Sequence, residues 1–387
     1  MNPVSTVVVG GGVIGASVAW HLASRGATDV LVLDRAPGIG HGSTAAATGG
    51  YRAQFATAIN VRLSLLSREK LLRFRDEIGA DSGYVAAGYL WIAEDEPALS
   101  ALGAAREIQH RQGLVEAVEV SPGDIARLQP AIAVDGIIGG AYCPTDGYIR
   151  PRSIQTGYVS AASRLGVRFT WDAQVTGFDR DGRGRIVAVR TSRDRVPCEI
   201  VVNAAGAWAG EVARLAGVEL PVLPLRRQMA STIPTRSVPP DAPMTLYCRD
   251  GFHFRERDGR VIFSWPTPGN PRDPFDTAVE PSWLSSVAAM RDGRVPALRG
   301  VPLDIPACWA GLYEMSPDKH AILGRAAPAS NLYFVNGSSG HGVMHAPALG
   351  HLLAEIILDG RATTVDATPL SPDRFEQGRV FPAADIL

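Results

Sequence analysis

Apolar residues recur along this chain at two spacings, and the alternation between them predicts a mixed α/β fold. An apolar, β-branched run from Val4 to Val9 predicts a strand, a helical pattern follows it, and a second apolar strand covers 30–33. A glycine-rich loop is expected over 38–50, and the long helix after it includes the stretch from Arg62 to Arg75. The first 80 residues are therefore expected to fold as strand, helix, strand, loop and helix.

Strands are expected to dominate the middle of the chain. Residues 167–191 alternate with period two around the turn 181–184, which is typical of a hairpin. The other elements expected, in chain order, are a strand at 88–93, a charged helix from 96 to about 112, a strand at 137–142, a turn at 144–147, a helix at 152–165, a strand ending at Asn203, and short strands at 245–247, 252–255 and 261–265. After 305 the pattern returns to strand, loop and helix.

This order predicts an α/β protein with an α+β substrate domain. A Rossmann-like nucleotide-binding domain is interrupted by an antiparallel, β-rich substrate domain. We assign residues 1–80, 141–215 and 306–387 to the nucleotide-binding domain, and residues 81–140 and 216–305 to the substrate domain.

The first strand leads into a G-x-G-x-x-G loop at the start of a helix. Gly10 permits the tight turn, Gly12 lets the backbone approach a pyrophosphate, and Gly15 allows close helix–strand packing. The pyrophosphate is expected at the positive end of the helix dipole. Asp34 ends the next strand 19 residues after Gly15, where its carboxylate accepts hydrogen bonds from a ribose. A 2'-phosphate would be repelled there, so the site favours FAD or NAD over NADP.

Length, charge and composition exclude several classes. With 387 residues and 46% hydrophobic content, the chain has room for two or three domain-sized units. With a net charge of -1, the chain has no excess of positive charge for binding nucleic acid or an anionic membrane. No run reaches the roughly 18 apolar residues of a membrane span, and the strand starting by Val4 leaves no room for a signal peptide, so we expect a soluble, cytoplasmic protein.

The cysteines and lysines disfavour further kinds of site and reaction. The four cysteines are far apart and form no C-x-x-C pair, so neither a disulfide framework nor a metal site is expected. Of the 38 basic Lys and Arg residues only Lys70 and Lys319 are lysines, and both are in positions typical of solvated charges. Schiff-base chemistry is therefore disfavoured.

A second strand delivers a glycine-rich loop to a helix between Tyr333 and Gly350, and its centre is Gly340-His341-Gly342. FAD has use for such a loop, because its isoalloxazine lies far from its pyrophosphate and negative charge builds on the N1 and C2=O edge on reduction. Free N–H groups at a helix N-terminus stabilise that charge. A nicotinamide dehydrogenase needs no second loop, so NAD is the disfavoured alternative.

These motifs resemble the D-amino-acid oxidase superfamily, and within it the group of sarcosine oxidase β subunit, dimethylglycine dehydrogenase and proline dehydrogenase β subunit. The resemblance covers nearly the whole chain and rests on both glycine loops and on the segments 42–52, 203–208 and 309–318. It implies FAD, and oxidation of secondary or tertiary amino acids by hydride transfer to flavin N5. The residues that it and the loops place at the cofactor are Gly10, Gly12, Val13, Ile14, Gly15, Asp34, Arg35, Gly42, Ser43, Thr44, Gly49, Val175, Ala205, Gly206, Trp208, Gly311, Gly340, His341, Gly342, Val343 and Met344.

The chain also differs from this group at positions where the resemblance would place functional residues. A cysteine that bonds flavin covalently is replaced by Gly311, and a flavin-bearing histidine falls in 45–47, which is all alanine, so noncovalent FAD is expected. A second carboxylate-binding lysine is replaced by Met344. The lysine that activates dioxygen falls near Ile262, and its absence favours a dehydrogenase over an oxidase, although Arg255, His253 or His345 can supply a charge.

Five residues are candidates for the catalytic site. Arg52 matches the arginine that holds the substrate carboxylate, and a guanidinium grips a carboxylate bidentately. His341 is a possible base, although its place in the loop favours a backbone and packing role. Tyr313, Tyr247 and His253 are expected either to line the substrate cavity or to be ordinary core side chains.

The sequence leaves three functions open. The leading one is FAD-dependent oxidation of the C–N bond of a small N-substituted or cyclic amino acid to an imine. The alternatives are an FAD-bearing electron-transfer subunit that needs a partner subunit or electron acceptor, and a D-amino-acid dehydrogenase.

Overall fold

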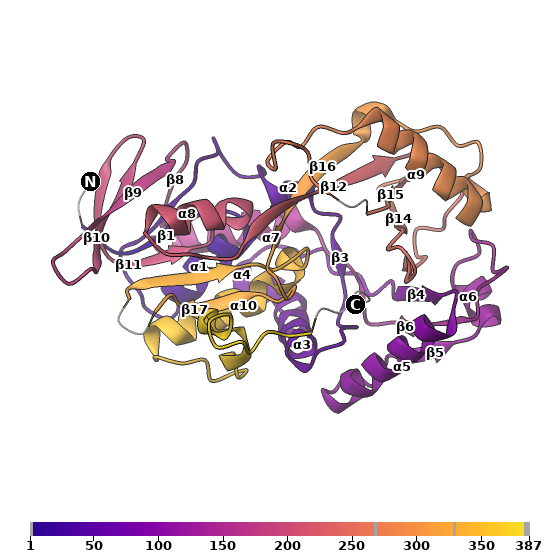
Figure 1. Cartoon of the computed structure of the whole chain (residues 1–387), viewed down its shortest axis with the longest axis horizontal. Helices are drawn as coiled ribbons and strands as arrows, with labels where there is room; N and C mark the ends of the chain where they lie inside the picture. The colour runs from indigo at the N-terminus through magenta and orange to yellow at the C-terminus, as the bar shows by residue number, and fades with distance from the viewer. Residues whose placement is uncertain (1–2, 267–268, 328–329, 383–387) are drawn as a thin grey trace.

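The computed structural model describes residues 3–266, 269–327 and 330–382, and its strands form two large sheets (Figure 1). The centre of the first sheet is parallel, because β1 pairs in parallel with both β2 and β11. The strands of this sheet in spatial order are β17 (Ile322–Arg325), β18 (Leu332–Asn336), β11 (Arg195–Asn203), β1 (Val4–Val9), β2 (Val30–Leu33) and β8 (Arg168–Thr170), with β10 (Ile186–Thr191) and β9 (Val175–Arg180) continuing from β11.

Helices from both ends of the chain cover the first sheet. Helix α1 (Val13–Ser24) packs against α10 (Gly342–Leu358), and Ser17 Oγ donates a hydrogen bond to the carbonyl of Ala346 at 2.8 Å. Gly350 makes this approach possible, because a Cβ there would lie 2.2 Å from Ser17 Oγ. Two further helices, α3 (Ala58–Leu72) and α7 (Pro151–Arg164), pack against this pair. Both glycine loops therefore open helices that belong to one packed unit.

The second sheet lies beside the first, and β12 and β16 run between the two halves of the molecule (Figure 1). Its strands in spatial order are β16 (Trp309–Met315), β12 (Leu223–Ser231), β15 (Arg260–Ser264), β14 (His253–Arg257), β13 (Met244–Tyr247), β4 (Tyr89–Ala93), β6 (Gly139–Cys143) and β5 (Val118–Val120). The remaining longer elements are α2 (Ser43–Ala46), α4 (Phe74–Ile78), α5 (Glu96–Arg111), α6 (Pro122–Leu128), α8 (Ala209–Leu215), α9 (Pro281–Arg294) and the pair β3 (Gly50–Tyr51) and β7 (Gly147–Tyr148).

The expected α/β fold is confirmed, and so is the hairpin of β9 and β10. Two features of the second sheet were not expected. The sheet is mostly antiparallel, as predicted, but β4 and β13 pair in parallel. The β-rich segment 220–305 also contains a helix, α9, whose Trp283, Leu284 and Val287 follow helical spacing and pack into the core of the second sheet.

The domain boundaries stay a prediction, although hydrogen bonding shows where two strands belong. Strand β16 and residues 141–143 of β6 come from segments assigned to the nucleotide-binding domain, yet both strands pair within the second sheet. Antiparallel pairing of residues 223–229 of β12 with all of β16 links the cavity-side edge of the second sheet to the C-terminal third of the chain.

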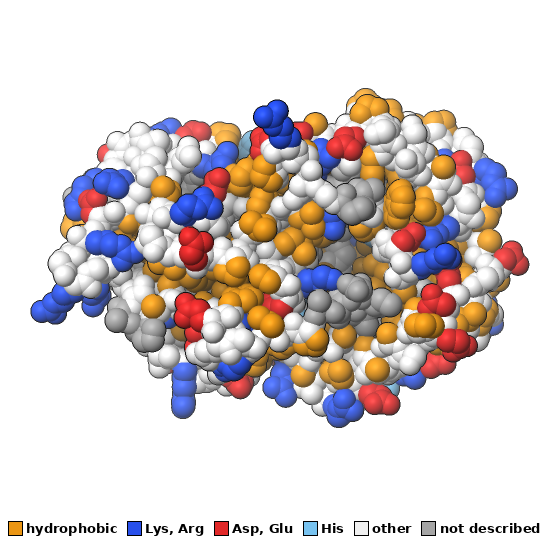
Figure 2. All heavy atoms as spheres, in the orientation of Figure 1, with side chains coloured by type: hydrophobic (Ala, Val, Ile, Leu, Met, Phe, Trp, Pro, Cys, Tyr) orange, Lys and Arg blue, Asp and Glu red, His pale blue; other side chains and the backbone are white. Residues whose placement is uncertain are grey.

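Charged side chains of both signs are spread around the edge of the face in Figure 2, and hydrophobic side chains gather in its middle. Among the described residues, no helix is long and apolar enough to cross a membrane.

Candidate active site

The first glycine loop has no room for a side chain at Gly10 or at Gly15. Gly10 has a φ of +105°, and a Cβ on it would lie 2.3 Å from the carbonyl oxygen of Ala204. A Cβ on Gly15 would lie 1.9 Å from the carbonyl oxygen of Gly10. Gly12, by contrast, faces open space on the cavity side, where the nearest atom to its Cβ position is Thr44 Oγ1 at 3.5 Å. The loop is thus locked against β11 and open toward the cavity.

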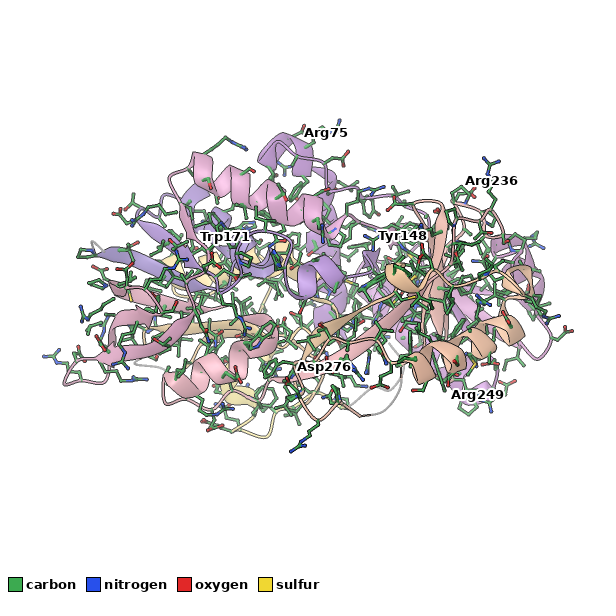
Figure 3. The ribbon with its side chains drawn as sticks, turned by 90° about the horizontal axis from the view of Figure 1, so that it is seen from above. Arg75, Tyr148, Trp171, Arg236, Arg249 and Asp276 are labelled. Atoms are coloured by element: carbon green, nitrogen blue, oxygen red, sulfur yellow. The ribbon has the colours of Figure 1, made fainter. Side chains whose placement is uncertain are left out.

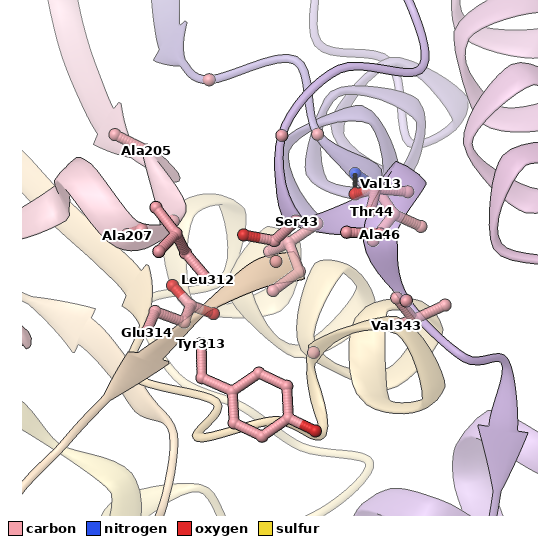
Figure 4. Close-up of a pocket in the computed structure, with 18 of the residues that line it drawn as sticks. Val13, Ser43, Thr44, Ala46, Ala205, Ala207, Leu312, Tyr313, Glu314 and Val343 are labelled. Atoms are coloured by element: carbon pink, nitrogen blue, oxygen red, sulfur yellow. Dashed lines mark hydrogen bonds between the residues drawn. The ribbon is translucent and has the colours of Figure 1, made fainter. Parts of the chain in front are cut away.

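Helix α2 and β2 complete this end of the cavity. Thr44 Oγ1 accepts a hydrogen bond from the Val13 N–H at 3.1 Å, drawn as a dashed line in Figure 4. Asp34 accepts hydrogen bonds from the N–H groups of Gly11 at 2.6 Å and Ala36 at 2.7 Å, which fix its carboxylate in the cavity wall. The Arg35 guanidinium lies 4.4 Å over the ring of Trp208.

The second glycine loop faces the same cavity from the other side. Gly340 has a φ of +93°, and a Cβ on it would lie 2.6 Å from the ring of Tyr313. His341 is the N-cap residue of α10, and no side chain caps the helix. Its first-turn N–H groups therefore remain available to a ligand in the cavity.

Together these segments enclose a cavity of about 660 Å³ (Figure 4). Nearly all of the predicted cofactor residues line it, and Gly15 is the exception, because it lies behind the loop. The predicted residues in its wall are Gly10, Gly12, Val13, Ile14, Asp34, Arg35, Gly42, Ser43, Thr44, Gly49, Val175, Ala205, Gly206, Trp208, Gly311, Gly340, His341, Gly342, Val343 and Met344. Residues far apart in the sequence thus meet around one space with two helix N-termini on it, which fits a long, anionic dinucleotide.

Arg52 is a buried cation in the cavity wall. Its side chain is 6% exposed, Nη2 donates to His341 Nε2 at 3.1 Å, and Nη1 donates to the carbonyl of Gln54. Burial lowers the pKa of Arg52, and among the described residues no carboxylate lies within ion-pair distance of it. Burial, then the charge of Arg52, holds the pKa of His341 well below its ordinary value, so the imidazole is neutral and accepts from the guanidinium.

The other catalytic candidates separate into two groups. Tyr313 and His253 line the cavity, whereas Tyr247 does not. Tyr247 is 2% exposed, and the guanidinium of Arg294 lies 4.4 Å over its ring. His253 Nδ1 lies 2.8 Å from the carbonyl of Gly251, so Nδ1 carries the proton and Nε2 remains an acceptor. Burial lowers its pKa.

Several residues in and behind the cavity wall were not anticipated from the sequence. Asp146 lies behind the wall: it is fully buried and accepts hydrogen bonds from the Ala53 N–H at 2.7 Å and from Gln54 Nε2 at 3.1 Å, so it fixes the segment that carries Arg52. Its only sequence signal was the turn at 144–147. Tyr89, Arg227 and Glu314 line the cavity itself. They reach it through strand pairing in the second sheet, which no local motif reveals.

Glu314 is a buried carboxyl at the base of the second glycine loop. It is 8% exposed, Oε1 accepts from the Ser338 N–H at 3.3 Å, and Oε2 has no partner among the described residues. Figure 4 shows Glu314 and Tyr313 leaving β16 on opposite sides. Burial raises the pKa of Glu314 to about 7.

We expect Glu314→Gln to stabilise the flavin-free protein at pH 8 but hardly at pH 5. A raised folded-state pKa means that the stability from the protonated carboxyl is complete below its ordinary pKa and is lost as pH rises through about 7. At about 1.4 kcal/mol per pKa unit, the loss that the substitution avoids is up to about 3 kcal/mol. Thermal unfolding at the two pH values measures it.

Glu355 provides the matched control. Hydrogen bonds from Thr364 and Thr363 outweigh its burial and lower its pKa to about 2, so its stabilising contribution is present at both pH 5 and pH 8. Glu355→Gln should therefore destabilise the protein equally at both. A stability change for Glu314→Gln that is the same at both pH values would contradict the buried, proton-binding state of Glu314.

One glycine loop joins a strand to a helix, and a second glycine loop lines the same cavity. This arrangement defines a dinucleotide-dependent enzyme. The sequence pattern of the family described as FAD dependent oxidoreductase (DAO) matches residues 5–356. The chain belongs to this family and is an FAD-dependent oxidoreductase, which confirms the resemblance inferred from the motifs.

Individual relatives cover most of the chain. FAD-dependent oxidoreductase domain-containing protein 1 of Bos taurus is 31% identical in an alignment of 421 positions, which covers 96% of this chain and 85% of that protein. Dimethylglycine dehydrogenase, mitochondrial, of Rattus norvegicus is 29% identical over 96% of this chain, but the match spans only 44% of that longer protein. The crystal structure of L-proline dehydrogenase from P. horikoshii has a TM-score of 0.89 and 27% identity, covering 98% of this chain and 100% of that one.

Proposed function

We propose that this protein oxidises the C–N bond of a small N-substituted or cyclic amino acid to an imine, which water then hydrolyses. The observation that carries the proposal is Arg52, a buried guanidinium in the cofactor cavity that forms no ion pair with a carboxylate of the described residues. The charge of Asp146 and the ring of Phe55 stabilise this cation, yet burial still lowers the pKa of Arg52. A ligand carboxylate offsets the remaining cost of burying the charge. A substrate carboxylate supplies the negative charge and binds bidentately.

The cavity residues fit FAD as the oxidant. When bound, FAD takes the two electrons as a hydride from the carbon next to nitrogen. Arg52 holds the substrate carboxylate, and His341 holds Arg52. The substrate must lose a proton from nitrogen as well as a hydride from carbon. No dedicated base is needed if the amine binds unprotonated, because its lone pair then drives hydride departure. Burial lowers the pKa of His253, which makes its Nε2 a weak base for an ammonium form. Water then adds to the imine carbon and releases an amine and a carbonyl compound.

We further propose that FAD is bound without a covalent link and that electrons pass to an acceptor other than dioxygen. A Cβ on Gly311 would lie 2.5 Å from the Cβ of Ala46, so the two positions at which the resemblance implies covalent attachment face each other and carry no reactive atom. Ile262, in the position where the resemblance implies a dioxygen-activating lysine, is 4% exposed and apolar.

The visible spectrum of the purified protein, before and after acid precipitation, followed by anaerobic titration with amines, tests both proposals. We expect a yellow protein that releases FAD into the supernatant and is bleached by one class among sarcosine, other N-methyl amino acids, proline analogues and D-amino acids. Colour left in the pellet would disprove noncovalent binding. A flavin that none of these amines bleaches would overturn the proposed reaction and favour an electron-transfer subunit that needs a partner.

A further inference from the structure

Arg227 is a second cation on the cavity wall, and neither the motifs nor the proposed reaction gives it a role. It lies on β12 directly opposite Gly311 of β16. Opposed residues of an antiparallel pair point to the same face, and so do residues two apart in one strand. Arg227 therefore shares its face with Tyr313, and its Cζ lies 5.8 Å from the centre of the Tyr313 ring. Ala46 fills the space where a side chain of Gly311 would lie, and Arg227 reaches the cavity wall beside it.

No protein carboxylate neutralises Arg227 among the described residues. Its hydrogen bond within the described part of the chain runs from Nη1 to the carbonyl of Arg226 at 3.2 Å. The neighbouring Arg226 shows the contrast, because its guanidinium bonds to Glu280 and lies 3.8 Å from Asp276. Burial lowers the pKa of Arg227. Arg226 is thus held by acidic side chains of the protein, whereas the charge of Arg227 faces the cavity.

Arg227 and Arg52 act on the same part of the cavity. Tyr313 is their common neighbour: its pKa is raised by burial, and the charges of Arg227 and Arg52 oppose that rise. The ring of Tyr313 also contacts Gly340, whose neighbour His341 is bonded to Arg52. The nearest cavity acid, Glu314, leaves β16 on the side opposite to Tyr313 and is half protonated near neutral pH. The space around Tyr313 is therefore positive, with two guanidinium groups.

We propose that the substrate carries two carboxylates, one held by Arg52 and the other by Arg227, with the oxidised C–N bond between them. The substrate class is then an N-substituted amino dicarboxylic acid. This inference rests on the proposed oxidation of an amino acid, and it adds no new chemical step, because the second carboxylate is bound and not altered. Tyr313, which lines the cavity beside Arg227, would then lie next to the second carboxylate.

Two independent readouts test it on the FAD-loaded protein. The first is the perturbation of the flavin spectrum by unreactive acids, glutarate against butyrate. The second is anaerobic flavin reduction by iminodiacetate or N-methyl-aspartate against sarcosine. We expect the diacids to bind about 100-fold more tightly than the monoacids, since each charge-assisted pair that is lost costs about that factor.

The Arg227→Leu variant should abolish the preference for diacids while changing monoacid binding only a few-fold, and Arg227→Lys should restore part of it. Arg236→Leu is the matched control, because it removes the same charge from an exposed side chain that points away from the molecule in Figure 3. Its diacid preference should equal that of the wild type.

The outcomes separate the two proposals. Equal binding of diacid and monoacid by the wild type, or a diacid preference that survives in Arg227→Leu, would overturn the two-carboxylate inference even if sarcosine bleaches the flavin. A strong preference for glutarate in a protein that no amine reduces would overturn the proposed oxidation and leave the inference about Arg227 standing. The wild-type comparison decides the question if Arg227→Leu fails to fold.

Discussion

Gly15→Ala is expected to emerge from purification without flavin and with a greatly lowered melting temperature. The new Cβ would lie 1.9 Å from the carbonyl oxygen of Gly10, a backbone atom that has no rotamer to change. Gly10 cannot retreat, because its own N–H donates to Leu33 at 2.8 Å and the carbonyl of Ala204 lies behind it. Overpacking against an immobile backbone costs about 3 kcal/mol or more, and it distorts the loop on which a pyrophosphate must sit.

The ratio of flavin to protein absorbance and thermal unfolding measure this effect. Gly103→Ala is the matched control: Gly103 lies within α5, and a Cβ there meets nothing within 4 Å. The same methyl group should stabilise that helix by about 1 kcal/mol and leave the flavin content unchanged. A Gly15→Ala protein that keeps its flavin and melts like the wild type would show that the loop can move away from Gly15.

Arg52→Leu is expected to slow flavin reduction by carboxylate-bearing amines about 1,000-fold while FAD stays bound. The substitution removes two charge-assisted bonds of about 1.5 to 3 kcal/mol each from the substrate, and it leaves the first glycine loop untouched, although His341 of the second loop loses its bond from Arg52. The lost interaction orients the substrate as well as binding it, so both the limiting rate and the apparent affinity should fall. Anaerobic rapid mixing, with the flavin absorbance as signal, separates the two.

Two controls distinguish carboxylate binding from general damage. Arg52→Lys keeps the charge but loses the planar fork, so its activity should lie between those of Arg52→Leu and the wild type. Arg249→Leu removes an exposed arginine that projects outward in Figure 3, and it should behave as the wild type. If Arg52→Leu reduces as fast as Arg249→Leu, the carboxylate is bound elsewhere.

The sequence predicted those parts of the site that a strand–loop–helix motif contains. The two glycine loops and Asp34 reach the cavity as the sequence predicted, because each motif fixes its own local geometry, whereas their contact with a cofactor stays a prediction. Arg227 was not foreseen, because only the register of β12 against β16 brings it opposite Gly311. For Tyr247 the sequence left a cavity position and a core position open, and the structure places it in the core: alternation along a strand says which residues share a face but not which face meets the cavity.

Buried polar side chains that support the site were also not predicted from the sequence. Asp146 stood in an ordinary turn sequence, and nothing local showed that its carboxylate would support the segment before Gln54. Helix α9 was missed although its apolar spacing was present, because short strands on either side dominated the interpretation.

The hydrogen bond between Ser17 and Ala346 joins positions 329 residues apart, and this separation bears on when the two helices can pack during synthesis. Helix α1 is synthesised long before its packing partner α10. Closing so long a loop is slow, and domains assemble only once their parts are present. A nascent chain that has not reached α10 holds the phosphate loop without its counterpart, so we expect cofactor binding to follow the synthesis of α10.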